Sequence, residues 1–287
     1  MEINNLVLNY SVRKSTKIAK IIEPLTIISG IHGFFHYTIS PKGLFTYIGS
    51  HPAWCEEYFG EKYYLNNPFL CHPSGLREGV HFPNTARDEQ YLEMLQLRKK
   101  RIDSDHAMLL VNKAQGSAEV FGFFTSTENS HVYNFYANER PLLLSFINYF
   151  KEEMIDDLNA MKISPANIAK AKKNLFFQNG NNHFIEPTKR LAFLKALGKN
   201  VDWLGSLKFT QREKEVLRYL KTGRTALEIA SALFISGRTV EKYLENIKRK
   251  LCCERRSEIF ERLSELDSIG FSDGVDKVDN NPHSVNC

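Results

Sequence analysis

The chain has few of the features that mark membrane, secreted or metal-binding proteins. Its longest nearly apolar stretch, residues 21–31, is interrupted by Glu23, Pro24 and Gly30, and it is far shorter than the roughly 20 residues that a membrane-spanning helix needs. The first residues show no basic segment followed by an apolar one, so no secretory signal is predicted. The 5 cysteines form no CxxC pair, which indicates reduced thiols and neither a zinc site nor disulfides. A cytoplasmic protein without a membrane partner is therefore expected.

Patterns of catalytic and cofactor sites are also missing. There is no GxxxxGK[ST] phosphate-binding loop, and no Ser-His-Asp or Cys-His arrangement can be recognised. Five histidines in the first half have spacings unlike those of common metal sites: His32, His36, His51, His72 and His81. We predict no enzymatic activity, no metal and no cofactor; a lactone or ester hydrolase is an alternative that no constellation of residues supports.

The composition is that of a globular protein with two domains. Apolar residues make up 43% and charged residues 25% of 287 residues, and domains commonly hold about 100 to 200 residues each. The net charge of +5 is unevenly distributed, because residues 208–262 carry 14 basic and 8 acidic side chains, a net of +6. A compact basic block of this kind is typical of a segment that meets phosphate groups.

Strand-like and helix-like patterns alternate over the first 160 residues. Segments 34–39 and 44–48 flank the turn Ser40-Pro41-Lys42-Gly43 and predict a β-hairpin. Further strands are predicted at 107–111 and 119–125, and amphipathic helices at 11–28, 85–100 and 139–159. These patterns predict an α+β protein whose residues 1–162 form an α-β-α sandwich around an antiparallel sheet, similar to GAF and PAS domains. Residues 163–205 are predicted to form a connector and residues 269–287 a disordered tail.

Residues 206–268 predict an all-α domain of four short helices with explicit start signals. Thr210 with Glu213, and Thr225 with Glu228, match the capping box, and Ser236 is a favourable N-cap. The order of a short helix, a tight turn and a longer helix is typical of a helix-turn-helix. A DNA-binding domain is therefore predicted here.

The longer helix, which begins after Ser236, has two distinct faces. Val240, Leu244, Ile247 and Leu251 form an apolar stripe, and the opposite polar face is free to enter a DNA major groove about 12 Å wide. Glu241, Lys242 and Glu245 are the candidates for reading bases. The other DNA-binding candidates, mainly for phosphate contacts, are Arg224, Thr225, Ser236, Arg238, Thr239, Asn246 and Lys250. The alternative is a solvated charged face on an ordinary helical bundle.

This segment closely resembles the LuxR-type, or GerE-type, DNA-binding domain. The resemblance rests on Phe209–Leu217, Glu228-Ile229-Ala230, Thr239–Tyr243 and Asn246–Leu251, with departures at Leu227 and at Cys252-Cys253. It implies a transcriptional regulator that binds double-stranded DNA as a homodimer. In this family the last helix forms the dimer, and here Ile259, Leu263 and Leu266 make an apolar stripe on it.

The first domain resembles the autoinducer-binding domains of the same family. The spacing of Trp54, Tyr58 and Asn67-Pro68 follows their signature, with Asn67 in place of aspartate, Phe82 where a second tryptophan would lie and Ser50 where tyrosine is common. The resemblance implies a pocket in which Trp54 donates to a lactone carbonyl, residue 67 accepts from the ligand amide, and aromatic rings surround an acyl chain. A bond to neutral Asn67 is about half as strong as one to a carboxylate. The expected ligand is an acyl-homoserine lactone or a divergent small amphiphile.

Two alternatives remain for the first domain. Trp54 and Tyr58 lie one helical turn apart and can equally belong to a hydrophobic core. The domain would then be a ligand-independent interaction module that docks RNA polymerase or a protein antagonist.

Overall fold

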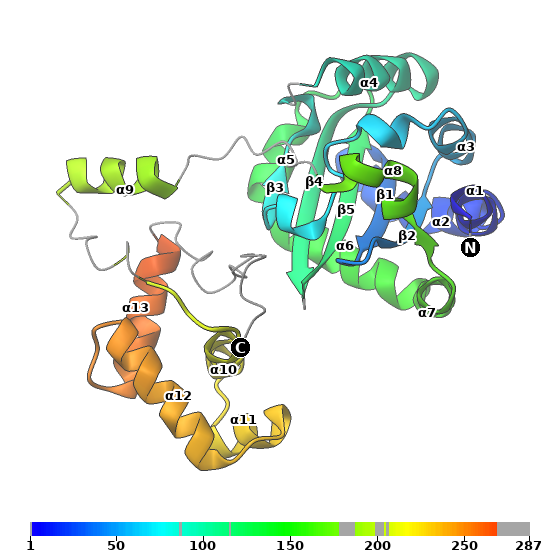
Figure 1. The fold of residues 1–287 in the computed structure, drawn as a ribbon. Helices are drawn as coiled ribbons and strands as arrows, with labels where there is room; N and C mark the ends of the chain where they lie inside the picture. The colour runs from blue at the N-terminus through cyan, green and yellow to red at the C-terminus, as the bar shows by residue number, and fades with distance from the viewer. Residues whose placement is uncertain are drawn as a thin grey trace. The chain divides into compact units, whose positions relative to one another are not determined.

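The computed structural model describes residues 2–85, 88–114, 116–177, 187–198, 204 and 207–268. The chain forms two compact units, Met1–His183 and Phe184–Cys287 (Figure 1). The first unit mixes helices with a β-sheet and the second contains helices, so the predicted α+β class is confirmed. Within the described ranges, no helix combines the length and the apolar character needed to cross a membrane.

The sheet of the first unit has 6 strands in the order β3-β4-β5-β1-β2-β6. Its strands are β1 (Ile31–Ile39), β2 (Leu44–Gly49), β3 (Gly79–His81), β4 (Asp105–Ala114), β5 (Ser117–Thr125) and β6 (Ala166–Asn167). Every neighbouring pair is antiparallel, and the two hairpins predicted from the sequence are formed by β1 with β2 and by β4 with β5. The predicted central antiparallel sheet is therefore confirmed.

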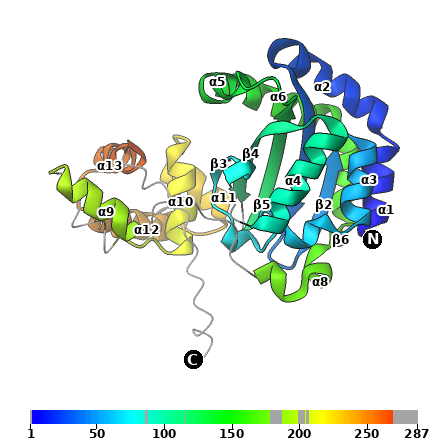
Figure 2. The ribbon, with the colours of Figure 1, turned by 90° about the horizontal axis from the view of Figure 1, so that it is seen from above.

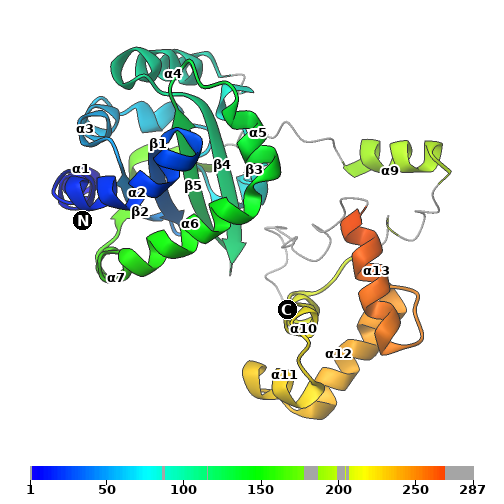
Figure 3. The same ribbon diagram turned by 180° about the vertical axis from the view of Figure 1, so that it is seen from behind.

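Helices lie on both faces of this sheet, and Figure 3 shows α2 and α6 in front of it. The helices of the unit are α1 (Ile3–Val7), α2 (Ser15–Ser29), α3 (Pro52–Gly60), α4 (Glu89–Ile102), α5 (Val132–Asn138), α6 (Arg140–Glu153), α7 (Ile155–Ile163) and α8 (Ile168–Lys172). Phe34 of β1 packs its ring on Phe146 and Phe150 of α6. Its neighbour Phe35 points to the opposite face because successive strand residues alternate. That second face carries the cavity described below.

The first unit extends beyond the predicted end of the sensor domain at residue 162. Residues Ala166–Asn167 add strand β6 to the edge of β2, and the following Phe176 is completely buried. The Nζ atom of Lys172 donates to the carbonyl oxygens of Tyr64 and Asn67, at 3.1 and 2.9 Å. Residues 163–177 are thus part of the first unit and not of a free connector. The predicted tail lies outside the described residues, and so do residues 178–186, 199–203 and 205 of the predicted connector.

The second unit consists of short helices around a separate apolar core. They are α9 (Pro187–Ala196), α10 (Gln211–Lys221), α11 (Ala226–Leu233), α12 (Gly237–Lys250) and α13 (Arg256–Ser268), and Figure 2 shows them from above. The four helices predicted from the sequence are α10 to α13. Both capping boxes are formed, and the Oγ atom of Ser236 accepts from the backbone N–H of Thr239 at 3.1 Å. The start signals in the sequence thus placed these helices correctly.

The apolar stripe of α13 does not form a free dimer surface. Ile259, Leu263 and Leu266 are 0%, 3% and 1% exposed, and all three belong to the core of the second unit. Val216 of α10 and Ile247 of α12 belong to the same core. The expectation that this stripe mediates dimerisation was wrong, because a small helical unit needs the stripe for its own core.

Candidate DNA-binding surface and ligand cavity

Helix α12 buries one side in its own unit and leaves the other side exposed. Val240, Leu244 and Ile247 are at most 2% exposed. Arg238, Glu241, Lys242 and Glu245 are all exposed on the other side. The amphipathic pattern of the sequence therefore correctly separated the core residues from the free polar face.

The N-terminus of α12 offers backbone donors and positive charge. Ser236 caps the helix and is itself exposed, and Arg238 lies in the first turn. Free N–H groups and the helix dipole favour an anion at such an end. The end of the preceding helix α11 has Phe234 in the left-handed region, with φ of 54°, which makes the tight turn between the two helices.

Several of the DNA-binding candidates make contacts within the unit. Glu245 pairs with Lys248 at 2.6 Å, and the Asn246 side chain accepts from Arg249 at 3.0 Å. These two contacts are on the surface and can exchange for contacts with DNA. The hydroxyl of Thr225 donates to Glu228 at 2.8 Å within its capping box.

Two basic DNA-binding candidates, Arg224 and Lys250, differ in their contacts within the unit. The guanidinium of Arg224 lies over the Tyr219 ring at 4.9 Å and is exposed. The Nζ atom of Lys250 lies 2.5 Å from Oε2 of Glu213, whose side chain is only 3% exposed. Lys250 therefore neutralises a buried carboxylate of its own unit, and the structure does not support its assignment as a phosphate contact.

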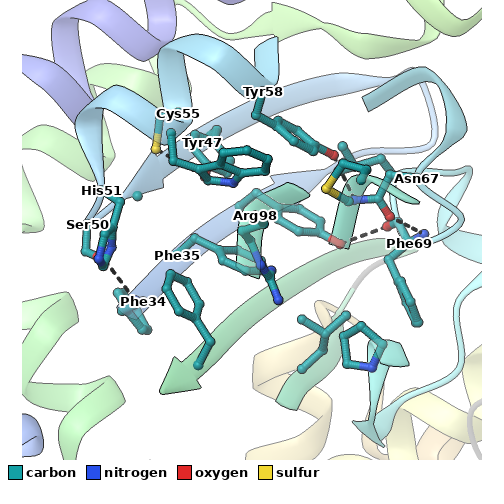
Figure 4. A pocket seen from close by; sticks show the side chains of 18 of the residues that line it. Phe34, Phe35, Tyr47, Ser50, His51, Cys55, Tyr58, Asn67, Phe69 and Arg98 are labelled. Atoms are coloured by element: carbon teal, nitrogen blue, oxygen red, sulfur yellow. Dashed lines mark hydrogen bonds between the residues drawn. The ribbon is translucent and has the colours of Figure 1, made fainter. Parts of the chain in front are cut away.

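The first unit contains a cavity between the sheet and helices α3 and α4 (Figure 4). Its volume is about 660 Å³ when the solvent at its open mouth is included, but its interior is narrow and holds only a few water molecules. It is lined by Phe34, Phe35, Tyr37, Tyr47, Gly49, Ser50, His51, Trp54, Cys55, Tyr58, Asn67, Phe69, Leu70, Pro83, Tyr91, Met94, Arg98, Leu109 and Phe124. An aromatic lining with a few polar groups is typical of sites for small organic ligands.

The structure brings Trp54, Tyr58 and Asn67 together in the wall of this cavity. The rings of Trp54 and Tyr58 lie 6.2 Å apart on α3, and each residue is 7% exposed. The two residues therefore both line the cavity and belong to the hydrophobic core.

Both polar atoms of the Asn67 side chain already form hydrogen bonds within the chain. Its Nδ2 atom donates to the Tyr58 hydroxyl at 2.8 Å, and its Oδ1 atom accepts from the backbone N–H of Phe69 at 2.9 Å. The second bond fixes the orientation of the amide. The Tyr58 hydroxyl keeps its own proton for a further acceptor, so it is the better donor to a ligand at this point.

Ser50 lines the cavity, whereas Phe82 does not. The Ser50 hydroxyl accepts from the backbone N–H of Phe34 at 2.9 Å and lies 2.9 Å from Nδ1 of His51. Phe82 is 37% exposed and contacts the ring of Tyr133, with the centroids 5.6 Å apart. The position that the sequence pattern assigned to a ligand aromatic thus lies outside the cavity wall.

Two polar residues of the cavity were not predicted from the sequence. Burial lowers the pKa of His51 to about 4, so its ring is neutral at pH 7. Arg98 is 7% exposed, and its guanidinium lies 5.1 Å from the centre of the Phe124 ring. Within the described part of the chain its Nε atom has no hydrogen-bond partner. The spacing of Tyr91, Met94, Leu95 and Arg98 places the arginine on the buried face of α4, and this was the available signal.

The capped short helix, the tight turn and the longer helix with an exposed polar face define the second unit as a helix-turn-helix DNA-binding domain. Residues 207–262 match the family model "Bacterial regulatory proteins, luxR family". The spore germination protein GerE of Bacillus subtilis (strain 168) is 38% identical over 60 residues, which are 21% of this chain and 81% of GerE. The chain therefore belongs to the luxR family.

A second relative is a longer protein, and it too matches this chain over a short segment only. The regulatory protein SdiA of Escherichia coli (strain K12) is 32% identical over 69 residues. These residues are 24% of this chain, and the match spans only 29% of SdiA. The crystal structure of Escherichia coli SdiA has a TM-score of 0.31 at 14% identity, over 91% of this chain and 95% of SdiA. SdiA in complex with octanoyl-rac-glycerol has a TM-score of 0.30, also at 14% identity, with 87% of both chains covered. These values are too low to assign the first unit to a family.

Proposed function

We propose that this luxR-family regulator binds double-stranded DNA through α12 and is controlled by a small amphiphilic ligand in the cavity of the first unit. The exposed polar face of α12 supports the first part most directly. The aromatic cavity supports the second. The proposal assigns the chain to regulation and not to catalysis, and a cytoplasmic location accords with this role.

We assign some residues of α12 to phosphate contacts, which position the protein on the duplex, and others to base contacts, which read the DNA sequence. The exposed Arg238 and the capped N-terminus of α12 suit phosphate groups, which fix the protein on the duplex. Lys242 and Glu241 follow on the exposed face and are placed to meet base edges in the major groove. The net charge of +6 over residues 208–262 adds a general attraction to DNA.

We expect the regulator to act as a homodimer on two half-sites about 34 Å apart. The buried stripe of α13 is not available for this dimer. Exposed apolar side chains elsewhere, such as Phe260 at 42% exposure on the other side of α13, are the surface we favour. RNA polymerase is a further expected partner.

A physical connection links the cavity with the chain that leads to the second unit. Asn67 lines the cavity, and its carbonyl oxygen accepts from Lys172, the last residue of α8. The backbone N–H of His72 donates to the carbonyl oxygen of Phe176 at 2.6 Å in the same region. A ligand that orders the loop of residues 64–72 would therefore also fix the segment 172–176.

The experiment is fluorescence anisotropy of the full chain with a duplex that it selects from a random pool. Lys242→Ala should weaken binding about tenfold, a loss of roughly 1.4 kcal/mol. Lys189→Ala is the matched control, because Lys189 is an exposed lysine of α9, outside α10 to α12. Equal losses in both variants would contradict the assignment of α12.

The second candidate function is a ligand-independent interaction module in the first unit. The observation that favours it is that the side chains of Asn67 and Ser50 already have hydrogen-bond partners within the chain. Mass spectrometry of organic extracts from the purified protein, with thermal unfolding against acyl lactones, separates the two functions. Neither a co-purified molecule nor any stabilisation would favour the interaction module.

A further inference from the structure

The cavity contains a buried cationic side chain, Arg98, that forms no ion pair with any residue the structure describes. Arg98 is only 7% exposed, and its Nε atom has no hydrogen-bond partner among the described residues. No Asp or Glu is among the described residues that line the cavity. Figure 4 shows the Arg98 side chain among the aromatic rings, with no hydrogen bond drawn to the residues around it.

The contacts within the protein compensate this charge only partly. Removing an ionised group from water is strongly unfavourable unless the group is paired and hydrogen-bonded. The Phe124 ring, 5.1 Å from the guanidinium carbon, offsets only part of this cost. An arginine stays charged even when burial lowers its pKa, so neutralisation does not remove the cost.

The carboxylate of Asp105 attracts Arg98 from beyond ion-pair distance, but it is engaged by other groups. Asp105 is held by Lys99 at 2.7 Å and by Asn84 at 2.8 Å. Burial raises the pKa of Tyr58 and of Tyr91, so both phenols are neutral at pH 7. Neutral phenols are donors, and they add hydrogen bonds for an acceptor group that enters beside the arginine.

We propose that the cavity takes an amphiphilic organic carboxylate, whose carboxylate pairs with Arg98 while its apolar body lies among the aromatic rings. The inference rests on the proposed function, which places a small ligand in this cavity. A bidentate pair between a guanidinium and a carboxylate is among the strongest polar contacts in proteins. Asn67 lies in the wall of the same cavity and is neutral, so it does not repel a carboxylate. The narrow interior favours a body of one aromatic ring or a short acyl chain.

The test compares acids with amides that have the same body. Binding of 4-phenylbutanoate and 4-phenylbutanamide, and of octanoate and octanamide, is measured on the full chain at pH 7.5 by calorimetry and thermal unfolding. We expect each acid to bind about tenfold or more tightly than its amide, as a buried charge-assisted bond provides. Arg98→Met should abolish this preference, and Lys100→Met, which removes an exposed charge from the same helix, should retain it.

A further variant and the binding of neutral probes distinguish a failure of the carboxylate proposal from a failure of ligand control. Arg98→Lys keeps the charge without the planar fork, so it should retain the preference for acids at a reduced ratio. If amides bind as well as acids, or if Arg98→Met keeps the preference, the carboxylate inference is overturned while ligand control stands. If neither class of probe binds and neutral acyl lactones also fail, both the inference and ligand control are overturned. DNA binding by α12 is measured independently of either.

Discussion

The ammonium of Lys250 at the end of α12 pairs with the carboxylate of Glu213 in the first turn of α10, with 2.5 Å between Nζ and Oε2. Glu213 also accepts from the backbone N–H of Thr210 as part of its capping box. The pair therefore connects α12 to α10, and it explains why a basic residue at position 250 serves the fold.

Loss of Lys250 should mainly lower stability. Lys250→Ala leaves the 3% exposed carboxylate of Glu213 without its cation, and we expect a loss of about 2–3 kcal/mol in the free energy of unfolding. Urea unfolding followed by circular dichroism measures this. The double variant Glu213→Gln with Lys250→Met should recover part of the loss. A variant that unfolds like the wild type but binds DNA weakly would restore the phosphate-contact role.

Removal of the Ser236 cap should affect both stability and DNA affinity. The Ser236 hydroxyl satisfies the backbone N–H of Thr239, so Ser236→Ala should cost about 1 kcal/mol of stability. It should also weaken DNA binding, because the first turn of α12 frays. Ser236→Asp is the informative companion: aspartate restores the cap, but its charge should repel phosphate. Thermal unfolding together with anisotropy distinguishes the two effects.

Lowering the pH should destabilise the first unit already above the pH range in which carboxylates become protonated. Burial lowers the pKa of His51 to about 4, with further lowering by His32 and Arg98, against 6.5 for a free histidine. The unfolded chain therefore binds a proton that the folded chain excludes, and stability falls as the pH drops from about 6.5 toward 4. At pH 5.5 His51 alone lowers the free energy of unfolding by about 1 kcal/mol.

Urea unfolding at pH 7.5 and 5.5 measures this effect. The pKa values of His36 and His81 are also lowered by burial, so the wild type should lose more than the share of His51 alone. His51→Gln should lose less stability between the two pH values than the wild type does. His131→Gln, at an exposed position, is the control and should behave like the wild type. An unchanged pH response in His51→Gln would contradict this account.

Local signals made the second unit predictable. A capping box needs only residues three apart, so Thr225 and Glu228 revealed the start of α11 without knowledge of the fold. The period of Val240, Leu244 and Ile247 likewise separated the two faces of α12. Where the stripe of α13 packs depends on other helices, and for this reason Ile259 was wrongly expected at a dimer surface.

The site of the first unit was less predictable because its geometry is spatial. The signature spacing led to Trp54, Tyr58 and Asn67, which do meet at the cavity. Nothing in the sequence indicated that the amide of Asn67 would be held by Tyr58 and Phe69. The missing partner of Arg98 also becomes visible only when every neighbour of the buried side chain is known.

The central claim is that the exposed face of α12 meets DNA, and the salt dependence of binding by the full chain and by Arg238→Ala tests it most directly. Arg238 is exposed in the first turn of α12 and is the proposed phosphate contact, and each neutralised phosphate releases counterions. The logarithm of the binding constant should fall linearly with the logarithm of salt concentration, and Arg238→Ala should reduce the slope by about 1. A binding constant that does not change with salt, or an identical slope in the variant, would contradict the claim.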